Sequence, residues 1–489
     1  MKSLPLLLSV FLSASLFGQN VYIPDTNFKA CLVEDHWIDA NGDLEIQESE
    51  AKAYKDDLDC SFRNITDLTG IEAFTNIKTL VCSGNQFASL DLSQNTALFF
   101  LRCGQNEQLT SLDLGQNTAL IKLWCEDNEQ LTSLDLSQNT SLTEIYCHSN
   151  NKLTSLNLGQ NTALTTLDCS GNQLTSLDLS QNTALTKLWC GGDQLTSLDL
   201  SQNIALVELK CSGDQLTSLD LSQNKALIEL WCFGDKLTNL DLSQNTVLTK
   251  LGCGGDQLTS LDLSQNIALI KLTCFGDKLT NLDLSQNTVL TELGCGGDQL
   301  TSLDLSQNTA LTELELKRTQ ITSLDLSQNT ALTNLRCGDN QLTSLNLSQN
   351  TALTELVLYR TQITSLDLSQ NTALTNLTCV DNQLTSLDLS QNTALTKLYC
   401  YGNNLTSLDL SQNIALTELN CGKNQLTSLD LSQNIALTKL RCFDNQLTSL
   451  DLSQNKALIE LWCQGNQFKC VSGIRENPKL YGRRVDKCD

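Results

Sequence analysis

The chain has 489 residues and a formal net charge of -24, with 55 Asp and Glu against 31 Lys and Arg. Because so acidic a surface repels a phosphate backbone, we exclude nucleic acid as a partner. After the N-terminus no apolar run approaches the roughly 18 residues that a transmembrane helix needs, so we expect no transmembrane segment.

Residues 1–18 have the features of a secretory signal peptide. Lys2 precedes an apolar run from Leu4 to Phe17 that contains small Ser and Ala residues. This order of a charged start, an apolar centre and small residues is typical of a segment that is cleaved on export, here near Gln19. We therefore expect the mature protein to be secreted.

Residues 19–75 differ from the rest and are expected to form an N-terminal cap. Asp25 is a helix-capping residue, and Phe28, Cys31 and Leu32 follow it at helical spacing, which predicts a short helix between residues 24 and 37. A degenerate first coil of the following array is expected at residues 58–68.

The cap also contains a segment with the oxygen-ligand spacing of an EF-hand calcium loop. Hard calcium ions need a cage of oxygen atoms, and this spacing supplies one. The departure is Leu44 at loop position 6, where glycine normally permits a sharp turn. The alternative is a hydrophilic turn between two helices. The candidate calcium ligands are Asp39, Asn41, Asp43, Glu45, Gln47 and Glu50; no other cofactor is expected.

Residues 76–468 are filled by close copies of one unit, for example the segment LTSLDLSQNTALTKLWCGGDQ at residues 174–194. We number a coil from its first Leu, so that Leu185 is position 1, Trp189 position 5 and Cys190 position 6. The coils begin at Ile77 and recur every 21 or 22 residues, which gives 19 coils. Such a period indicates a leucine-rich repeat solenoid, in which each coil buries its apolar residues against its neighbours.

Within a coil, apolar residues alternate with polar ones around positions 3–6 and again around positions 14–16. This period of two predicts two short parallel strands per coil, one on each wall, with Leu and Cys inside. Position 19 is Asn in all 18 coils that complete it, and its amide is expected to donate to and accept from main-chain groups at the turn.

The Cys at position 6 are expected to be reduced packing residues. Leu316 and Leu358 replace Cys in two coils, so the position demands an inward apolar group, and free Cys behaves as a small hydrophobe. The alternative is a metal or disulfide role. Outside the repeats, Cys470 and Cys488 are the expected disulfide, closing a C-terminal cap at residues 469–489.

The unit LTSLDLSQNTALTKLWC resembles the repeats of internalin-family leucine-rich repeat proteins of the 21-residue, cysteine-ladder type. The resemblance covers about four fifths of the chain. It implies a curved right-handed solenoid with parallel strands on the concave wall and short strands or extended segments on the convex wall. It also implies a bacterial protein, secreted or held at the cell surface, that binds a protein or glycan ligand and has no catalytic activity.

Positions 3, 5, 7 and 8 vary between coils, whereas the Leu and Asn positions scarcely do. Four of the five Trp of the protein occupy position 5. Aromatic and Arg side chains carry much of the binding energy in recognition surfaces; the alternative is that the rings only cover the sheet. The predicted ligand-binding face comprises Arg102, Trp124, Tyr146, Trp189, Trp231, Phe233, Phe275, Arg336, Tyr399, Tyr401, Arg441 and Trp462.

Two rows of acidic residues follow the coils. Position 15 is Asp in 16 of 18 coils, and we expect water and neighbouring hydroxyl groups, rather than cations, to offset its charge. Position 9 is Asp in six consecutive coils from Asp193 to Asp298, where the family has Asn. Because Asp cannot donate a hydrogen bond as Asn does, these coils are expected to be less stable.

No catalytic site is predicted. His36 and His148 lie in different regions and are expected to be solvated, and no Ser, His and Asp cluster is evident. We therefore expect a secreted or surface-displayed, non-enzymatic protein that recognises a protein ligand on its concave wall. The alternatives are a glycan-binding adhesin that uses exposed Trp and Tyr, and a structural spacer without a specific ligand.

Overall fold

The computed structural model describes residues 18–192, 194–213, 215–234, 236–255, 257–276, 278–468, 470–473, 479–480 and 486–487. The chain divides into two compact units, Met1–Leu206 and Val207–Asp489. The predicted signal peptide lies outside the described residues except for its last residue, Gly18.

The N-terminal cap contains the predicted short helix. Helix α1 spans Thr26–Val33, and the Asp25 carboxylate caps it by accepting hydrogen bonds from the main-chain N–H groups of Asn27 (2.9 Å) and Phe28 (3.0 Å). Its buried face holds Phe28, Cys31 and Leu32, as the spacing predicts. Helix α2 (Glu48–Ala53) and the 3-10 turn η1 (Ile71–Ala73) complete the helical part of the cap.

A disulfide joins the cap helix to the first coil. Cys31, on the buried face of α1, is bonded to Cys60, with their Cα atoms 5.9 Å apart. Cys60 is in register with the position 6 Cys of the following coils, but it is bonded because the cap helix brings a second Cys against it. The predicted Cys470–Cys488 bond stays a prediction, since Cys488 lies outside the described residues.

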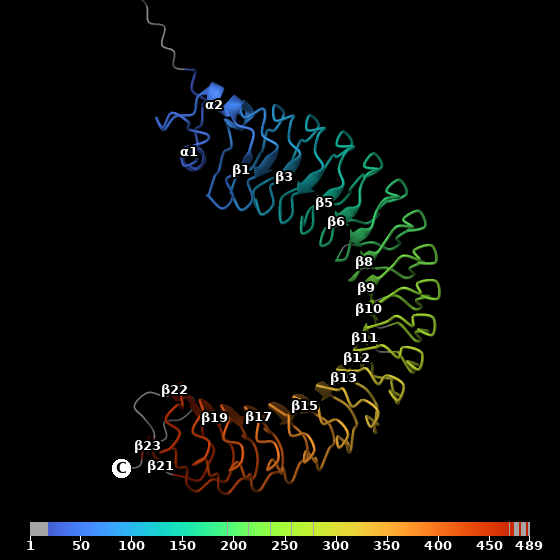
Figure 1. The fold of residues 1–489 in the computed structure, drawn as a ribbon, viewed down its shortest axis with the longest axis vertical. Helices are drawn as coiled ribbons and strands as arrows, with labels where there is room; N and C mark the ends of the chain where they lie inside the picture. Colours follow the sequence, from blue (N-terminus) through green and yellow to red (C-terminus); the bar gives the residue numbers. More distant parts are fainter. Residues whose placement is uncertain are drawn as a thin grey trace, which may run out of the picture. The chain divides into compact units, whose positions relative to one another are not determined.

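In the first unit each coil contributes one strand of three residues, and the strands pair in parallel with their Leu residues aligned. Taken by itself, the unit carries these strands on the inner side of the curve that its coils follow (Figure 1). The strands are β1 (Asp57–Asp59), β2 (Thr79–Val81), β3 (Phe100–Arg102), β4 (Lys122–Trp124), β5 (Glu144–Tyr146), β6 (Thr166–Asp168) and β7 (Lys187–Trp189).

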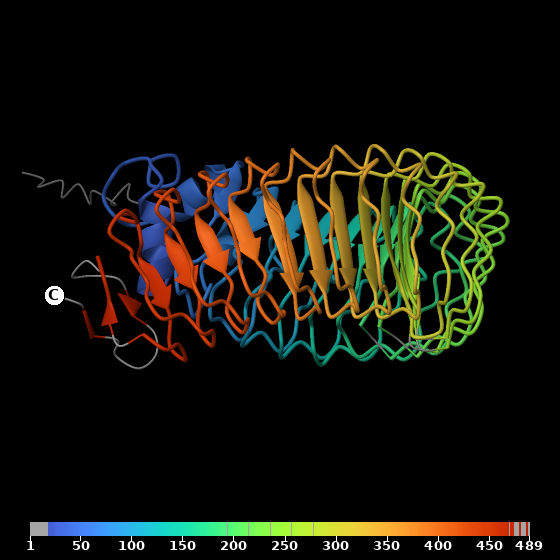
Figure 2. The ribbon, with the colours of Figure 1, turned by 90° about the horizontal axis from the view of Figure 1, so that it is seen from below.

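The second unit repeats this arrangement, and Figure 2 shows its orange strands running side by side. Strands β9 to β16 have five residues and so include position 7 of the coil. The strands are β8 (Glu208–Lys210), β9 (Glu229–Phe233), β10 (Lys250–Gly254), β11 (Lys271–Phe275), β12 (Glu292–Gly296), β13 (Glu313–Lys317), β14 (Asn334–Gly338), β15 (Glu355–Tyr359), β16 (Asn376–Val380), β17 (Lys397–Tyr399), β18 (Glu418–Asn420), β19 (Lys439–Arg441), β20 (Glu460–Trp462), β21 (Cys470–Val471), β22 (Lys479–Leu480) and β23 (Asp486–Lys487).

The opposite, convex wall consists of extended segments. In the described residues its pairing is limited to isolated bridges, such as Asp91 with Asp113, so the second strand per coil does not form. The Asp carboxylates at position 15 accept the main-chain N–H two residues later, as Asp178 does from Ser180 at 2.9 Å. This hydrogen bond, followed by one from the Ser180 hydroxyl, lowers the pKa of Asp178. Main-chain N–H groups, together with hydroxyl groups, therefore offset the negative charge of the Asp carboxylates at position 15.

The core is a stack of Leu and Cys side chains. Leu185, Leu188 and Cys190 are fully buried, and the same positions are buried in the other coils except at Leu458, which is half-buried in the last coil. Burying a Leu side chain contributes about 1.5–3 kcal/mol, and each coil obtains this burial only from its neighbours. The leucine-rich repeat solenoid is thus confirmed.

Buried Asn side chains at position 19 link the coils along the convex side. The amide of Asn117, for example, donates to the main-chain oxygens of Leu92 (2.9 Å) and Asn95 (3.0 Å) in the preceding coil. Its side-chain oxygen has no hydrogen-bond partner in the described part of the chain, and the same holds for Asn95 and Asn139. The predicted donor role is confirmed, whereas the predicted acceptor role is wrong because the turn supplies no N–H group to it.

A second Asn ladder at position 9 uses both ends of the amide. Asn150 donates to the oxygens of Cys125 (3.1 Å) and Cys147 (2.7 Å), and accepts from the main-chain N–H of Asn128 (2.9 Å). Asp298, which replaces Asn at this position, is exposed, whereas Asn150 is fully buried. The carboxylate cannot donate to the carbonyl groups, so it leaves the core. The other Asp of this row, Asp193 to Asp277, lie outside the described residues.

We expect Asp298→Asn to raise the free energy of unfolding by about 1 kcal/mol, because an amide restores donors for buried carbonyl groups. The reverse change, Asn340→Asp, should lower it by about 1–3 kcal/mol, since Asn340 is buried and donates to the oxygen of Leu316 (3.2 Å). Urea unfolding followed by circular dichroism measures both. Equal stability of the Asp298→Asn variant and the parent protein would contradict the view that the missing amide donor at this position lowers stability.

Candidate ligand-binding face

The strands carry two outward rows of side chains at positions 3 and 5, and the longer strands add position 7. Position 3 is an ionic row in which Lys and Glu of neighbouring coils pair, as in Lys122–Glu144 (2.9 Å) and Lys439–Glu418 (3.1 Å). Such exposed pairs each contribute under about 1 kcal/mol.

In the first unit, aromatic side chains at position 5, joined by Phe100 at position 3, form a cluster. The ring of Trp124 lies 5.1 Å from Phe100 and 5.3 Å from Tyr146, and Tyr146 lies 6.0 Å from Trp189, all in edge contacts. The Arg102 guanidinium stacks over Trp124 at 5.1 Å. Four of the predicted residues are therefore brought together, and all four are half-buried. Edge-to-face ring contacts of this kind stabilise by about 0.5–1.5 kcal/mol each.

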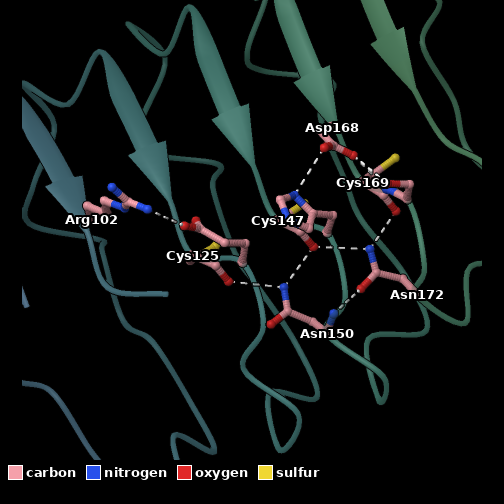
Figure 3. A network of polar contacts seen from close by, with 10 residues as sticks. Arg102, Cys125, Cys147, Asn150, Asp168, Cys169 and Asn172 are labelled. Carbon is pink, nitrogen blue, oxygen red and sulfur yellow. Dashed lines mark hydrogen bonds and ion pairs between the residues drawn. The ribbon is translucent and has the colours of Figure 1, made fainter. Parts of the chain in front are cut away.

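A polar network lies beside this cluster, at positions 5 and 7 (Figure 3). The Arg102 guanidinium contacts the Glu126 carboxylate at 3.4 Å, and the imidazole Nδ1 of His148 lies 3.0 Å from Asp168. Asp168 is 5% exposed. The expectation that His148 is solvated is therefore wrong, because Asp168 on the next strand fixes the imidazole. Beneath the network, Asn150 and Asn172 of the ladder bond to the Cys125 and Cys147 carbonyl groups.

The hydroxyl of Ser170 completes a Ser, Asp and His group that resembles a hydrolase triad only in composition. Ser170 Oγ donates to Asp168 at 2.6 Å, and the same carboxylate holds His148. In a triad the hydroxyl bonds to the imidazole, which takes its proton. Here the carboxylate separates the two, so this geometry does not activate the hydroxyl as a nucleophile.

In the second unit the predicted residues fall into separate groups. Trp231 and Phe233 lie 6.1 Å apart on β9, and the indole N–H of Trp231 donates to Glu229 at 2.8 Å. Phe275 lies two strands further on, beside Gly294. Arg336 is exposed and pairs with Glu355 at 2.8 Å.

A second cluster forms near the C-terminal end of the repeats. Phe443 bridges Tyr401 (5.7 Å) and Trp462 (6.3 Å), and Arg441 lies 5.4 Å over the Trp462 ring. Lys423 stacks on Tyr401 at 5.4 Å. The predicted residues Tyr401, Arg441 and Trp462 therefore meet, through a Phe that the predicted face did not include.

Glu residues at position 3 fix the position 5 side chains, and the predicted face omitted them. Glu144 accepts from Trp124 at 3.1 Å, and Glu460 accepts from Arg441 at 2.7 Å. Tyr399 donates to Glu418, and this bond is the main cause that lowers the pKa of Glu418; burial raises the pKa of Tyr399 to about 12. The signal was present in the sequence as a Glu 19 or 20 residues after the aromatic or Arg residue.

The position 6 thiols lie behind this face and are free and buried. Burial raises the pKa of Cys337 and Cys400 to about 12, so the reactive thiolate is not formed at neutral pH. Leu316 aligns with Cys295 and Cys337 on the neighbouring strands. The ladder is therefore a packing device, as predicted.

The candidate calcium loop is closed by its own hydrogen bonds. The Asp39 carboxylate accepts from the main-chain N–H groups of Gly42 (2.8 Å) and Leu44 (3.0 Å), and the Glu50 carboxylate accepts from Ala40 (3.0 Å) and Gln47 (2.9 Å). Leu44 adopts the left-handed conformation (φ 65°) that glycine normally supplies.

The remaining ligand candidates also have partners within the protein. Asn41 donates to Gln47 at 2.7 Å, Gln47 donates to Asp43 at 3.1 Å, and Glu45 pairs with Lys29 at 2.5 Å. Over the described residues no group of three His, Cys, Asp or Glu is arranged to hold a metal ion. Calcium binding therefore stays a prediction.

Calcium removal tests that prediction. If the loop binds calcium with a Kd of about 0.1 mM, as extracellular modules do, 10 mM calcium stabilises the cap by about 2.7 kcal/mol over chelator. We expect Glu50→Gln to abolish this gain, measured as the shift in melting temperature between calcium and EDTA, with Glu48→Gln as the control. Identical melting curves in both buffers would leave the loop a plain capping turn.

A further prediction concerns pH. The hydrogen bond to Asp168 is the main cause that raises the pKa of His148, and Asp127 and Glu126 add to it against burial. Because the folded-state pKa is above the unfolded value, the stabilisation is complete below the unfolded pKa and is lost as the pH rises through the folded pKa. Unfolding by urea at pH 6 and pH 8.5 should show a loss at the higher pH that His148→Gln removes.

The His148 pKa itself is measurable by NMR, because the protein has only two His and His36→Gln assigns the signals. Asp168→Asn should lower the pKa of His148. An unchanged pKa in that variant would show that the contact does not govern the titration.

No helix among the described residues has the length and hydrophobicity needed to span a membrane.

Comparison with known proteins supports the repeat assignment. The sequence matches the family of Leucine Rich repeats (2 copies) over residues 162–203. Internalin J of Listeria monocytogenes serotype 4b (strain F2365) is 40% identical over 77 residues, which are 16% of this chain and 8% of that protein. This chain thus matches only a small part of the length of that relative.

Two solved structures align with most of this chain. The functional domain of InlJ from Listeria monocytogenes, which includes a cysteine ladder, is 30% identical, with 90% of this chain and 79% of that chain covered and a TM-score of 0.47. YopM from Yersinia enterocolitica WA-314 is 19% identical, with 88% and 86% covered and a TM-score of 0.55. The likeness to YopM shows the fold alone.

Proposed function

Because this chain belongs to the leucine-rich repeat proteins and is related to internalin J, with its cysteine ladder, we propose that it is a non-enzymatic binding protein. Its ligand is a protein, bound on the wall that carries the strands. The protein is exported through the signal peptide at residues 1–18 and acts in secreted form or at a bacterial surface.

The observation that carries this proposal is the clustering of aromatic and Arg side chains on one wall. Trp124 and Trp462 each lie under an Arg and against a second ring, and a Glu on the next coil fixes Trp124 and Arg441. Side chains held in place lose little conformational entropy when a partner binds. Half-buried Trp and Arg are also the residues most often found at the energetic centre of protein interfaces.

The ring geometry favours a protein ligand over a glycan. A sugar ring stacks on a free aromatic face, whereas one face of Trp124 is covered by Arg102 and one face of Trp462 by Arg441. Trp231 lies over Gly252, since a Cβ atom there would be 2.1 Å from the indole. What these rings leave exposed is a rough surface of ring edges and paired charges, which suits the side chains of another protein.

We expect Trp124→Ala and Trp462→Ala, made separately, each to weaken binding of a protein ligand by about 2 kcal/mol or more, roughly 30-fold in Kd. The ligand is first sought by biolayer interferometry of the mature protein against an array of extracellular proteins and glycans. Ile414→Ala is the control, because Ile414 is 60% exposed and lies at position 20, off the strand wall.

Melting temperatures establish that the Trp variants are folded. Loss of binding in folded Trp variants but not in Ile414→Ala supports recognition on this wall. Binding of array glycans alone would identify an adhesin for sugars, and a silent array would favour a spacer.

A further inference from the structure

The wall of the second unit has two glycines at position 5, and only one of them is covered. Gly252 and Gly294 occupy equivalent positions in coils of nearly identical sequence, paired with Trp231 and Thr273 on the preceding strands. The Trp231 indole fills the space over Gly252, at 2.1 Å from the position of a Cβ atom. At Gly294 the nearest atoms to that position include Phe275 Cζ (3.6 Å) and Thr273 Cγ2 (3.8 Å), so these side chains make only ordinary contacts there and no ring fills the space.

The result is a notch of about 200 Å³ centred on Gly294. Thr273 lines one side, and the ring of Phe275 lies near the position of a Cβ atom on Gly294 without lining the notch. Charged side chains of positions 3 and 5 surround the rest, among them Glu292, Glu313 and Glu315. The notch lies wholly within the second unit.

The charges around the notch do not balance. Its two cations are engaged, since Lys271 pairs with Glu292 (2.6 Å) and Arg336 pairs with Glu355 outside the lining (2.8 Å). Glu315 contacts Lys317. The Glu313 carboxylate is exposed and makes no ion pair or hydrogen bond with the described residues. Three lining carboxylates against two lining cations leave a net charge of -1.

We propose that this notch receives one Arg or Lys side chain of the protein ligand, with its aliphatic stem against Thr273 and its charged group at Glu313. This assignment rests on the proposed function. It implies that the protein ligand presents a basic segment to the notch. A cation is favoured over a neutral group because the Glu313 carboxylate, which has no ion-pair partner among the described residues, gains an opposite charge. The net charge of -24 on the whole chain attracts such a segment from a distance.

The coil with Trp231 supplies the decisive variant. Thr273→Trp copies the arrangement of Trp231 over Gly252 and fills the notch without changing any charge. Thr378→Trp is its control, since Thr378 is also at position 5 of a strand in the same unit, β16, away from the notch. Gly294→Ser is a second filling variant, because an added Cβ meets only ordinary contacts there.

The probe is N-acetyl-L-arginine amide, with the uncharged N-acetyl-L-citrulline amide as its matched analogue, titrated into the full mature chain by NMR. A single side chain is expected to bind with a Kd in the millimolar range, on the order of 1 mM. We expect Thr273→Trp and Gly294→Ser to weaken arginine amide binding, the former at least tenfold, and Thr378→Trp to leave it unchanged. Glu313→Gln should weaken it about threefold and reduce its dependence on salt.

Several results would overturn the proposal. The first is that the citrulline amide binds as tightly as the arginine amide. The second is that the arginine amide still binds to a folded Thr273→Trp variant. The third is that methyl glucoside binds and that Thr273→Trp blocks this binding. Failure of the proposed function is a separate outcome. If arginine amide binds at the notch but the protein array stays silent, recognition of a protein is contradicted while the cation site stands.

Discussion

The structure depends on hydrogen bonds between neighbouring coils. Buried carbonyl groups at the turns of one coil must accept hydrogen bonds from side chains of the next. A coil of 21 residues cannot pair these groups internally, because its strand bonds only to the strands of adjacent coils. Buried Asn amides meet the need at two positions, and the Leu and Cys stack then closes around them. Where an Asp stands in place of the amide, as at Asp298, the side chain leaves the core and the turn is exposed. Hydrophobic burial supplies most of the free energy of this fold, but the Asn amides fix the register in which neighbouring coils stack.

The same register arranges the candidate site. Since the period brings position 5 of every coil into one row, residues 20 or more apart in sequence become neighbours, and aromatic side chains at that position form clusters without any special loop. Glu at position 3 of the following coil then orients them, as Glu144 does for Trp124. The wall is therefore a preorganised surface. Its side chains at position 5 vary between coils, whereas the Leu and Asn positions that hold the coils together scarcely change. Ring contacts and Arg stacking cover part of it, and the notch at Gly294 shows where a small residue leaves it open.

Periodicity made most of the fold predictable, because spacing of Leu, Cys and Asn determines which side chains face inward. The cap helix could be predicted for the same reason, from Asp25 and the apolar spacing after it. The sequence could not predict contacts that depend on how the cap packs on the repeats or on which side chains of adjacent strands face each other. The bond between Cys31 and Cys60 needs the cap helix to lie against the first coil, and the pairing of His148 with Asp168 needs two adjacent strands in register. For the face, residue type identified the rings, but only geometry showed that Phe100 and Phe443 join them and that Arg336 stands apart.

The Asn ladder at position 19 has a direction. In the bonds that the structure describes, each amide donates to the coil before it, beginning with Asn95, which donates to the carbonyl groups of Ile71 and Phe74 in the cap. The array is therefore polar in the way that a helix is, with amide donors presented at its N-terminal end and carbonyl acceptors presented at its C-terminal end. The two ends cannot exchange caps, because the first must offer carbonyl groups and the last must offer N–H groups or water. Gain or loss of whole coils in the interior leaves this polarity intact, so the array can change length over time while both of its ends stay fixed in chemistry.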